Sequence, residues 1–335
     1  MNHIPVLTKD ILSIFNPQSG DRLLDATLGL GGHTKAFLDM AGGSATAVGI
    51  EVDESALAQA KQQLSAYEGK LTFLQGNYFQ IKDFKEGKII PSESTSFSHI
   101  LFDLGIGSHQ LDDPERGFSF LHGSTLDMAF GENEDLPPSK LTSLNHLEKR
   151  LGRYPSALDI IQGLSKQQLA ELVRVYGEEK QAMKVAVMLQ EFAHLQNASE
   201  IANQMKEQMR GYERGRIHPA TRAFQALRIA VNRELEVLEA TLPIAIDLLA
   251  PNGKLGVISF HSLEDRIVKQ VFRQEAKGCV CPPEAPVCVC DKEARVTLLT
   301  RKPVVASEQE IEQNPRSRSA KLRVVQKVDT SAGSP

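Results

Sequence analysis

The segment Asp25-Ala-Thr-Leu-Gly29-Leu-Gly31-Gly32-His33-Thr34 decides how the first part of this chain folds. It follows a short apolar run, residues 22–26, and leads into a helical pattern over residues 33–41. Glycine allows the backbone to adopt positive φ and to approach a ligand closely. A glycine loop between a strand and a helix is typical of a nucleotide-type cofactor site at the carboxyl end of the strand. The segment therefore predicts such a site, the alternative being a tight turn with solvated acids.

The sequence around this loop alternates apolar runs with helical patterns. Residues 46–50, 71–75 and 99–104 have the character of strands, and residues 55–67 have that of a helix. Alternation at this spacing predicts a parallel sheet covered by helices on both faces.

The character of the chain changes near residue 110. From there to residue 213 it has loops and then amphipathic helical patterns, as over residues 165–176 and 178–196. Strand and helix patterns resume over 219–250 (one helix, or two broken near Pro243), 251–253 (a turn), 254–260, 262–271, 296–299 and 322–328. We therefore predict an α/β fold. A sheet domain would span residues 1–110 and 214–328, with an all-helical insertion over 111–213 and a disordered tail over 329–335.

Composition restricts the partners and the location. The 335 residues carry a formal net charge of −4, so any RNA would be held by local basic patches rather than by the whole surface. The sequence has no run of about 18 apolar residues, so we expect no membrane span. No apolar run follows a basic start at residues 1–5, so we expect no signal peptide. All four cysteines lie between Cys279 and Cys290, and a reducing cytoplasmic location is the simplest expectation.

The residues near the glycine loop favour one kind of cofactor. Dinucleotide-binding loops carry a third glycine, and Thr34 stands where it would fall. A sulfonium methyl donor has no phosphate and needs a nearby carboxylate, which Asp25 supplies. Glu51 ends the next strand, where an acid holds ribose hydroxyls, and Asp53 competes for that role. Tyr78, after the third strand, is expected to pack on adenine.

Asp103 ends the fourth strand, in the sequence Phe102-Asp103-Leu104. An acid at the end of an apolar strand is expected at the carboxyl edge of the sheet, facing the cofactor cleft. The alternative is an aspartate that caps a helix or a turn. Asp103 is therefore the candidate reaction centre.

A methyl donor could instead serve methylation of a pyrimidine ring carbon, which uses a cysteine nucleophile, usually after proline. The sequence contains no Pro-Cys pair, so this reaction is disfavoured.

Several short motifs occur in one order along the chain. Beside the glycine loop they are residues 3–7 (HIPVL), 110–120 (QLDDPERGFSF), 126–128 (LDM), 176–179 (YGEE), 216–222 (RIHPATR), 224–228 (FQALR), 258–266 (ISFHSLEDR) and 314–323 (NPRSRSAKLR). This set resembles the bacterial ribosomal RNA small-subunit methyltransferase H family over most of the chain. The sequence departs from the family pattern at Glu51, which is usually aspartate, and at Gly107 and Ala129.

The resemblance implies a class I S-adenosylmethionine-dependent methyltransferase, a Rossmann-like core with an inserted helical domain. The implied reaction is N4-methylation of a decoding-region cytidine of 16S rRNA, cytidine 1402 in conventional numbering. The implied partner is the small ribosomal subunit, with no membrane or DNA partner and with a homodimer left open. Asp103 would bond the cytosine amine and orient it, and Asp103 or a neighbouring water would take its proton. The implied cofactor residues are Gly31, Gly32, His33, Glu51, Tyr78, Asp103 and Gln110.

Basic residues that would contact RNA phosphates occur in two stretches. One contains Arg316, Arg318, Lys321 and Arg323, and the other contains Arg210, Arg214, Arg216, Arg222 and Arg228. The alternative for each stretch is a solvated charged surface. We assign substrate binding to four arginines: Arg116, Arg222, Arg316 and Arg318.

His261 and two phenylalanines are further candidates near the substrate. His261 follows the strand pattern 254–260 and is expected to face the cleft as a second catalytic residue, bonding the cytosine edge or a phosphate. A residue that merely begins a helix is the alternative. Phe118 and Phe120 would either stack on an extruded base or form local core, and local core is slightly favoured.

The cysteines form two Cys-x-Cys pairs, Cys279 with Cys281 and Cys288 with Cys290. On a hairpin, four thiolates arranged in this way could surround zinc tetrahedrally. The spacing is not the common Cys-x-x-Cys, so a structural metal and thiols without a metal both stay open. No metal is assigned to the active site.

Two other functions stay open at this point. A nicotinamide-dependent dehydrogenase is disfavoured by Thr34 and would bind NAD rather than S-adenosylmethionine. An RNA-binding assembly factor with a methyltransferase-like fold would bind small-subunit RNA and leave it unmethylated.

Overall fold

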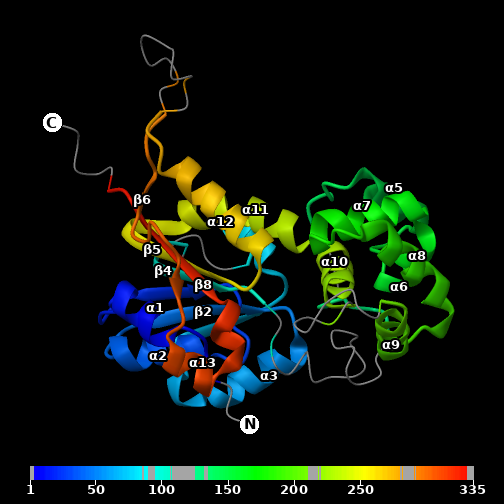
Figure 1. Cartoon of the computed structure of the whole chain (residues 1–335). Helices are drawn as coiled ribbons and strands as arrows, with labels where there is room; N and C mark the ends of the chain where they lie inside the picture. Colours follow the sequence, from blue (N-terminus) through cyan, green and yellow to red (C-terminus); the bar gives the residue numbers. More distant parts are fainter. Residues whose placement is uncertain are drawn as a thin grey trace. The chain divides into compact units, whose positions relative to one another are not determined.

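The computed structural model describes residues 4–84, 87–89, 95–105, 107, 125–131, 135–209, 218, 220–279, 281, 290 and 292–329. The chain divides into two compact units, one of residues 1–105 with 238–335 and one of residues 106–237. The first unit contains a sheet and the second is helical (Figure 1). Among the helices in the described ranges, none combines the length and the apolar character that crossing a bilayer requires.

The first unit is built on one sheet with the strand order β3-β2-β1-β4-β5-β8-β6 and with β7 paired to β8. Strands β1 to β5 are parallel, and β8 is antiparallel to β5, β6 and β7. The order reverses between β1 and β4, where open parallel sheets bind ligands beyond the carboxyl ends of the strands. The predicted Rossmann-like methyltransferase sheet is confirmed. The strands are β1 (Arg22–Asp25), β2 (Thr46–Glu51), β3 (Leu71–Gln75), β4 (Phe97–Asp103), β5 (Leu249–Ser259), β6 (Val296–Leu298), β7 (Val304–Val305) and β8 (Lys321–Lys327).

Helices cover both faces of this sheet, and the alternation of side chains along β8 separates the faces. Leu322 and Val324 join the apolar core that contains Phe15. Arg323, between them, donates a hydrogen bond of 2.7 Å to Asp265 of α12. Figure 1 accordingly shows α1 and α2 on one side of the strands and α12 on the other. The helices of this unit include α1 (Thr8–Phe15), α2 (Gly32–Ala41), α3 (Glu54–Gln63), α12 (Ser262–Glu275) and α13 (Glu308–Gln313).

Two sequence predictions in the second half of the chain are wrong. The helix over residues 219–250 breaks at Arg233 rather than near Pro243, and Pro243 lies inside α11 (Glu234–Leu248). Arg233 has φ +52°, which interrupts the helical ladder after α10 (Ala220–Asn232), and its buried guanidinium bonds Glu148 at 2.6 Å. The turn expected at residues 251–253 is instead an irregularity within β5. The pairing register with β4 shifts there, and Asn252 adopts φ +63°.

The second unit packs its helices around its own apolar core. Helix α6 begins with a capping box in which the side chains of Ser156 and Asp159 bond each other's backbone N–H. A buried network joins the hydroxyls of Tyr176 and Ser139 to the carboxylate of Glu236, with Tyr176 donating at 2.5 Å. Burial and this carboxylate raise the pKa of Tyr176, so the phenol stays protonated. The helices are α5 (Thr142–Leu151), α6 (Ala157–Gly163), α7 (Lys166–Gly177), α8 (Ala182–Phe192), α9 (Ala198–Gln208) and α10.

This compact unit includes α10 and runs to residue 237. The domain boundaries expected at residues 110 and 214 stay predictions. Of the predicted disordered tail, only Asp329 lies among the described residues.

Gly256 of β5 lies against the ring of Phe15, and a Cβ added there would be 2.9 Å from the ring Cζ. We expect Gly256→Ala to lower the free energy of unfolding by about 1–3 kcal/mol, because the ring must shift within a close-packed core. Chemical denaturation followed by circular dichroism measures this change. Gly278→Ala is the matched control, since the nearest atom to its added Cβ is 3.9 Å away. Equal denaturation midpoints for the two variants would contradict the steric argument.

Candidate active site

Asp103 is the last residue of β4 and lies at the carboxyl edge of the sheet, beside β1. Its backbone N–H donates to the hydroxyl of Thr27 at 2.6 Å, which ties β4 to the loop after β1. Its Oδ2 lies 3.4 Å from Nε2 of His33. Its Oδ1 is buried and, among the described residues, has no hydrogen-bond partner. A buried oxygen without a donor has lost its hydration, so Asp103 is prepared to accept a hydrogen bond from a ligand.

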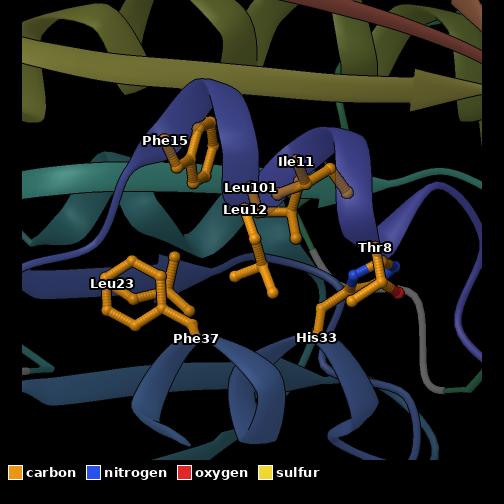
Figure 2. Close-up of a pocket in the computed structure, with 8 residues that line it drawn as sticks. All are labelled: Thr8, Ile11, Leu12, Phe15, Leu23, His33, Phe37 and Leu101. Atoms are coloured by element: carbon orange, nitrogen blue, oxygen red, sulfur yellow. The ribbon is translucent and has the colours of Figure 1, made fainter. Parts of the chain in front are cut away.

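His33, near the start of α2, packs between the glycine loop and α1. Figure 2 shows its ring beside Thr8, at one end of a small apolar cavity between α1 and α2. This cavity of about 10 Å³ has room for one water at most and is therefore not the cofactor site. Burial alone would lower the pKa of His33, but the carboxylates of Asp103 and Asp25 raise it above its ordinary value. The two side chains therefore form a close pair in which the carboxylate favours the protonated form of the imidazole.

The backbone of the loop makes two close approaches that require glycine. A Cβ at Gly31 would lie 2.6 Å from a methyl carbon of Leu64, and Gly31 also has φ +81°. A Cβ at Gly32 would lie 2.6 Å from the ring of Pro5. The loop therefore packs tightly against Leu64 and Pro5 at these two positions.

Asp25 fixes this loop from inside the protein. Its side chain is 1% exposed, and its carboxylate accepts from the Thr34 hydroxyl at 2.7 Å and from the Thr27 N–H at 3.3 Å. Burial raises the pKa of Asp25, against the opposing effect of the Thr34 bond. Asp25 was expected beside the cofactor, whereas its carboxylate serves the loop itself. The sequence reasoning missed Thr27 and Thr34. The signal for them is that a buried carboxylate needs donors close by.

Glu51 is the last residue of β2 and is 8% exposed. Its Oε2 accepts from the Gly29 N–H at 2.8 Å and its Oε1 from the Asp53 N–H at 2.9 Å. Burial raises the pKa of Glu51 to about 7. Each carboxylate oxygen retains a lone pair for another donor, such as a ribose hydroxyl. Asp53 caps α3 by accepting from the N–H of Ser55 at 2.8 Å, which favours Glu51 over Asp53 for the ribose role.

Tyr78 lies at the same edge of the sheet, where η2 (Tyr78–Asp83) follows β3. Its ring meets the ring of Phe102 edge-on, with the centroids 5.4 Å apart and an interplanar angle of 89°. The Asn77 side chain accepts from the Phe79 N–H at 2.9 Å and caps this turn. Tyr78 therefore brings an aromatic ring to the ends of β3 and β4.

His261 lies at the entrance to α12 and caps that helix. Its Nδ1 accepts from the Glu264 N–H at 3.4 Å, and its Nε2 lies 3.1 Å from Oε1 of Glu264. The Phe260 N–H donates to the same carboxylate at 2.8 Å. The structure thus gives His261 the role of beginning a helix, and its catalytic role stays a prediction.

The basic residues predicted to hold RNA differ in their surroundings. Arg316 and Arg318 are exposed in η5 (Pro315–Ser319). Arg323, expected in the same stretch, is 8% exposed and bonded to a carboxylate of α12. In the helical unit, Arg222 is 3.4 Å from the buried carboxylate of Glu179. Arg228 bonds Glu234 of its own unit. Other predicted residues lie outside the described ranges: Gln110, Arg116, Phe118, Phe120, Arg210, Arg214 and Arg216.

Known proteins match this chain over nearly its full length. The sequence fits the profile of the MraW methylase family over residues 1–152 and 143–328. The ribosomal RNA small subunit methyltransferase H of Thermomicrobium roseum is 42% identical over 97% of this chain and 94% of that protein. The proteins of the same name from Heliobacterium mobile and Geobacter sp. (strain M21) are 38% and 40% identical, over 98% of this chain and 99% of each relative.

Solved structures give a coarser likeness. An S-adenosylmethionine-dependent O-methyltransferase from Thermotoga maritima aligns over 98% of this chain and 68% of its own, with a TM-score of 0.39 and 8% identity. This likeness is too weak to support an argument about function. The family profile and the full-length relatives are decisive instead, and they show that the chain belongs to the MraW methylase family.

Proposed function

We propose that this chain transfers a methyl group from S-adenosylmethionine to N4 of a decoding-region cytidine of 16S rRNA, cytidine 1402 in conventional numbering. The observation that carries the proposal is the buried Oδ1 of Asp103, which has no partner among the described residues. It lies at the reversal of strand order, where a parallel sheet of this kind binds its ligands. Relatives of matching length are named as small-subunit rRNA methyltransferases.

The residues at this edge fit the methyl donor. Glu51 has lone pairs for ribose hydroxyls and Tyr78 has a ring for adenine. Gly31 and Gly32, where α2 begins, belong to the same proposed set. When bound, S-adenosylmethionine supplies a methyl group on a positively charged sulfur. The carboxylates of Asp25 and Asp103 are close enough to interact electrostatically, as are those of Asp25 and Glu51. Their negative field favours a cationic ligand. Gln110 completes the proposed cofactor set.

Asp103 acts on the acceptor nitrogen. The exocyclic amine of cytosine is a weak nucleophile because its lone pair is delocalised into the ring. A hydrogen bond from this amine to Asp103 favours rehybridisation of the nitrogen and holds it in place, and orientation of this kind lowers the barrier. The methylated nitrogen then loses a proton, which Asp103 or a neighbouring water accepts. His33, at 3.4 Å, steadies the carboxylate and balances its charge.

Substrate RNA is proposed to contact both units. The exposed guanidinium groups of Arg316 and Arg318 are suited to phosphates. Arg116 and the remaining donors of Arg222 belong to the same proposal, as does recognition of RNA by the helical insertion. His261 would contact the cytosine edge or a phosphate. We also propose a cytoplasmic location. A homodimer is a further possibility, and light scattering would distinguish it from a monomer.

Replacing Asp103 tests the reaction centre. We expect Asp103→Asn to lower the turnover number by about 10²- to 10⁴-fold, because the amide is a poorer acceptor and takes up no proton. Purified protein would be incubated with small ribosomal subunits that lack the modification, and N4-methylcytidine would be measured by mass spectrometry of the nucleosides. Asp39→Asn makes the same chemical change on the exposed surface of α2 and should leave turnover unchanged.

Two outcomes would count against the proposal. Near-normal turnover in Asp103→Asn would remove the role assigned to that carboxylate. Binding of the subunits by the wild-type protein without methylation, with S-adenosylmethionine present, would support an assembly factor instead.

The pKa of Glu51 predicts how cofactor affinity depends on pH. Ribose hydroxyls donate to the carboxylate, so affinity should be full only well above pH 7 and should fall as the pH decreases through the pKa of Glu51, about 7. The decrease should approach about tenfold per pH unit. Calorimetry between pH 5.5 and 8.5 measures it. Glu51→Gln should bind more weakly and lose this part of the pH dependence, while His33 titrates equally in both proteins. Identical pH profiles would contradict the assignment.

A further inference from the structure

Three cysteines come together in a part of the sheet unit that the proposed reaction does not use. Cys279 and Cys281 follow α12, and Cys290 precedes β6. Their Sγ atoms all lie within 4.8 Å of one another. Thiolates that converge in this way are the preferred ligands of zinc in structural sites.

The distance between two of the sulfurs distinguishes a metal site from a disulfide. The Sγ atoms of Cys279 and Cys290 are 3.8 Å apart. A disulfide would place them about 2.05 Å apart. Two thiolates bound to one tetrahedral zinc, each at about 2.3 Å, are separated by about 3.8 Å. The observed distance excludes a disulfide in this structure and matches neighbouring ligands on a shared ion, a separation that two thiols in contact also have.

The backbone around the cysteines supports a negatively charged sulfur. The N–H of Cys281 donates to Sγ of Cys279 at 3.4 Å. Hydrogen bonds of this kind to ligand atoms orient them and stabilise their charge in metal sites. The two chain segments are also fixed next to each other without a metal. The Arg295 N–H donates to the Glu275 carbonyl at 2.8 Å, and the Arg295 guanidinium bonds the Glu275 carboxylate at 2.9 Å.

We propose that Cys279, Cys281 and Cys290 bind a structural zinc ion. The ion would link the chain that follows α12 to the chain that precedes β6. Zinc takes four ligands, and Cys288, the remaining cysteine of the sequence, lies outside the described residues, so the proposal rests on the other three. The site is independent of the methyltransferase function, because none of its ligands belongs to the proposed active site.

Metal analysis of the full-length protein tests this proposal. The protein would be purified under reducing conditions without a chelator or a histidine tag, and its zinc would be measured by mass spectrometry of the elements. We expect about one zinc per chain, and less than about a tenth of that in a variant carrying Cys279→Ser and Cys290→Ser. Lys277→Ser is the control, because it introduces serine at an exposed position two residues before Cys279 and should retain the metal.

A second measurement does not depend on the folding of a variant. Mercurial modification of the wild-type thiols should release the zinc. In a separate, unmodified sample, cobalt exchanged for the zinc should give thiolate-to-cobalt charge-transfer absorption. Freshly purified wild-type protein that contains no zinc, whether its thiols are reduced or joined in a disulfide, would overturn the proposal. Unchanged zinc content in the double serine variant would overturn it as well.

Discussion

The buried carboxylate of Asp25 is the constraint on which the proposed active site depends. It can be buried because the Thr34 hydroxyl and the Thr27 N–H donate to it, and those bonds fix both ends of the glycine loop. Thr27 uses its own hydroxyl to receive the N–H of Asp103. One buried carboxyl group therefore sets the position of the loop and, through it, the end of the neighbouring strand. Burying Asp25 removes its hydration, and the two hydrogen bonds that it accepts from the loop compensate for that cost.

Three carboxyl groups, those of Asp25, Glu51 and Asp103, lie at the same edge of the sheet. Burial raises the free energy of their ionised forms. Glu51 has a pKa of about 7, and the carboxylates of Asp103 and Asp25 raise the pKa of His33. Two backbone N–H groups and one imidazole partly neutralise this edge in the free protein. A cationic ligand would neutralise it further, so binding and relief of electrostatic strain would occur together. By this electrostatic argument, a methyl donor with a sulfonium centre should suit the site better than an anionic dinucleotide.

The sequence predicts the parallel sheet, because the spacing of apolar runs and helical patterns survives in the structure as β1 to β5. It also predicts where Glu51 and Asp103 lie, since both end such runs. The sequence pattern does not predict contacts between residues that are far apart in the chain. Arg323 resembles its exposed neighbours in a basic stretch, but the alternation of β8 turns it toward Asp265. Likewise, Pro243 signals a helix break, whereas the left-handed backbone at Arg233, next to its buried guanidinium pair, decides where the helix ends.

Strand β8 has a consequence for the order in which the protein is made. It occupies the place between β5 and β6, yet residues 321–327 leave the ribosome after every other strand of the sheet. Until then β5 has an open edge, and such edges attract other unpaired strands. The N-terminal segment also lacks one of its contacts until late in translation, because the Leu7 N–H donates to the side chain of Glu310 at 2.7 Å. The sheet can therefore be completed only after translation has passed β8, and the nascent chain is open to edge-to-edge pairing until then.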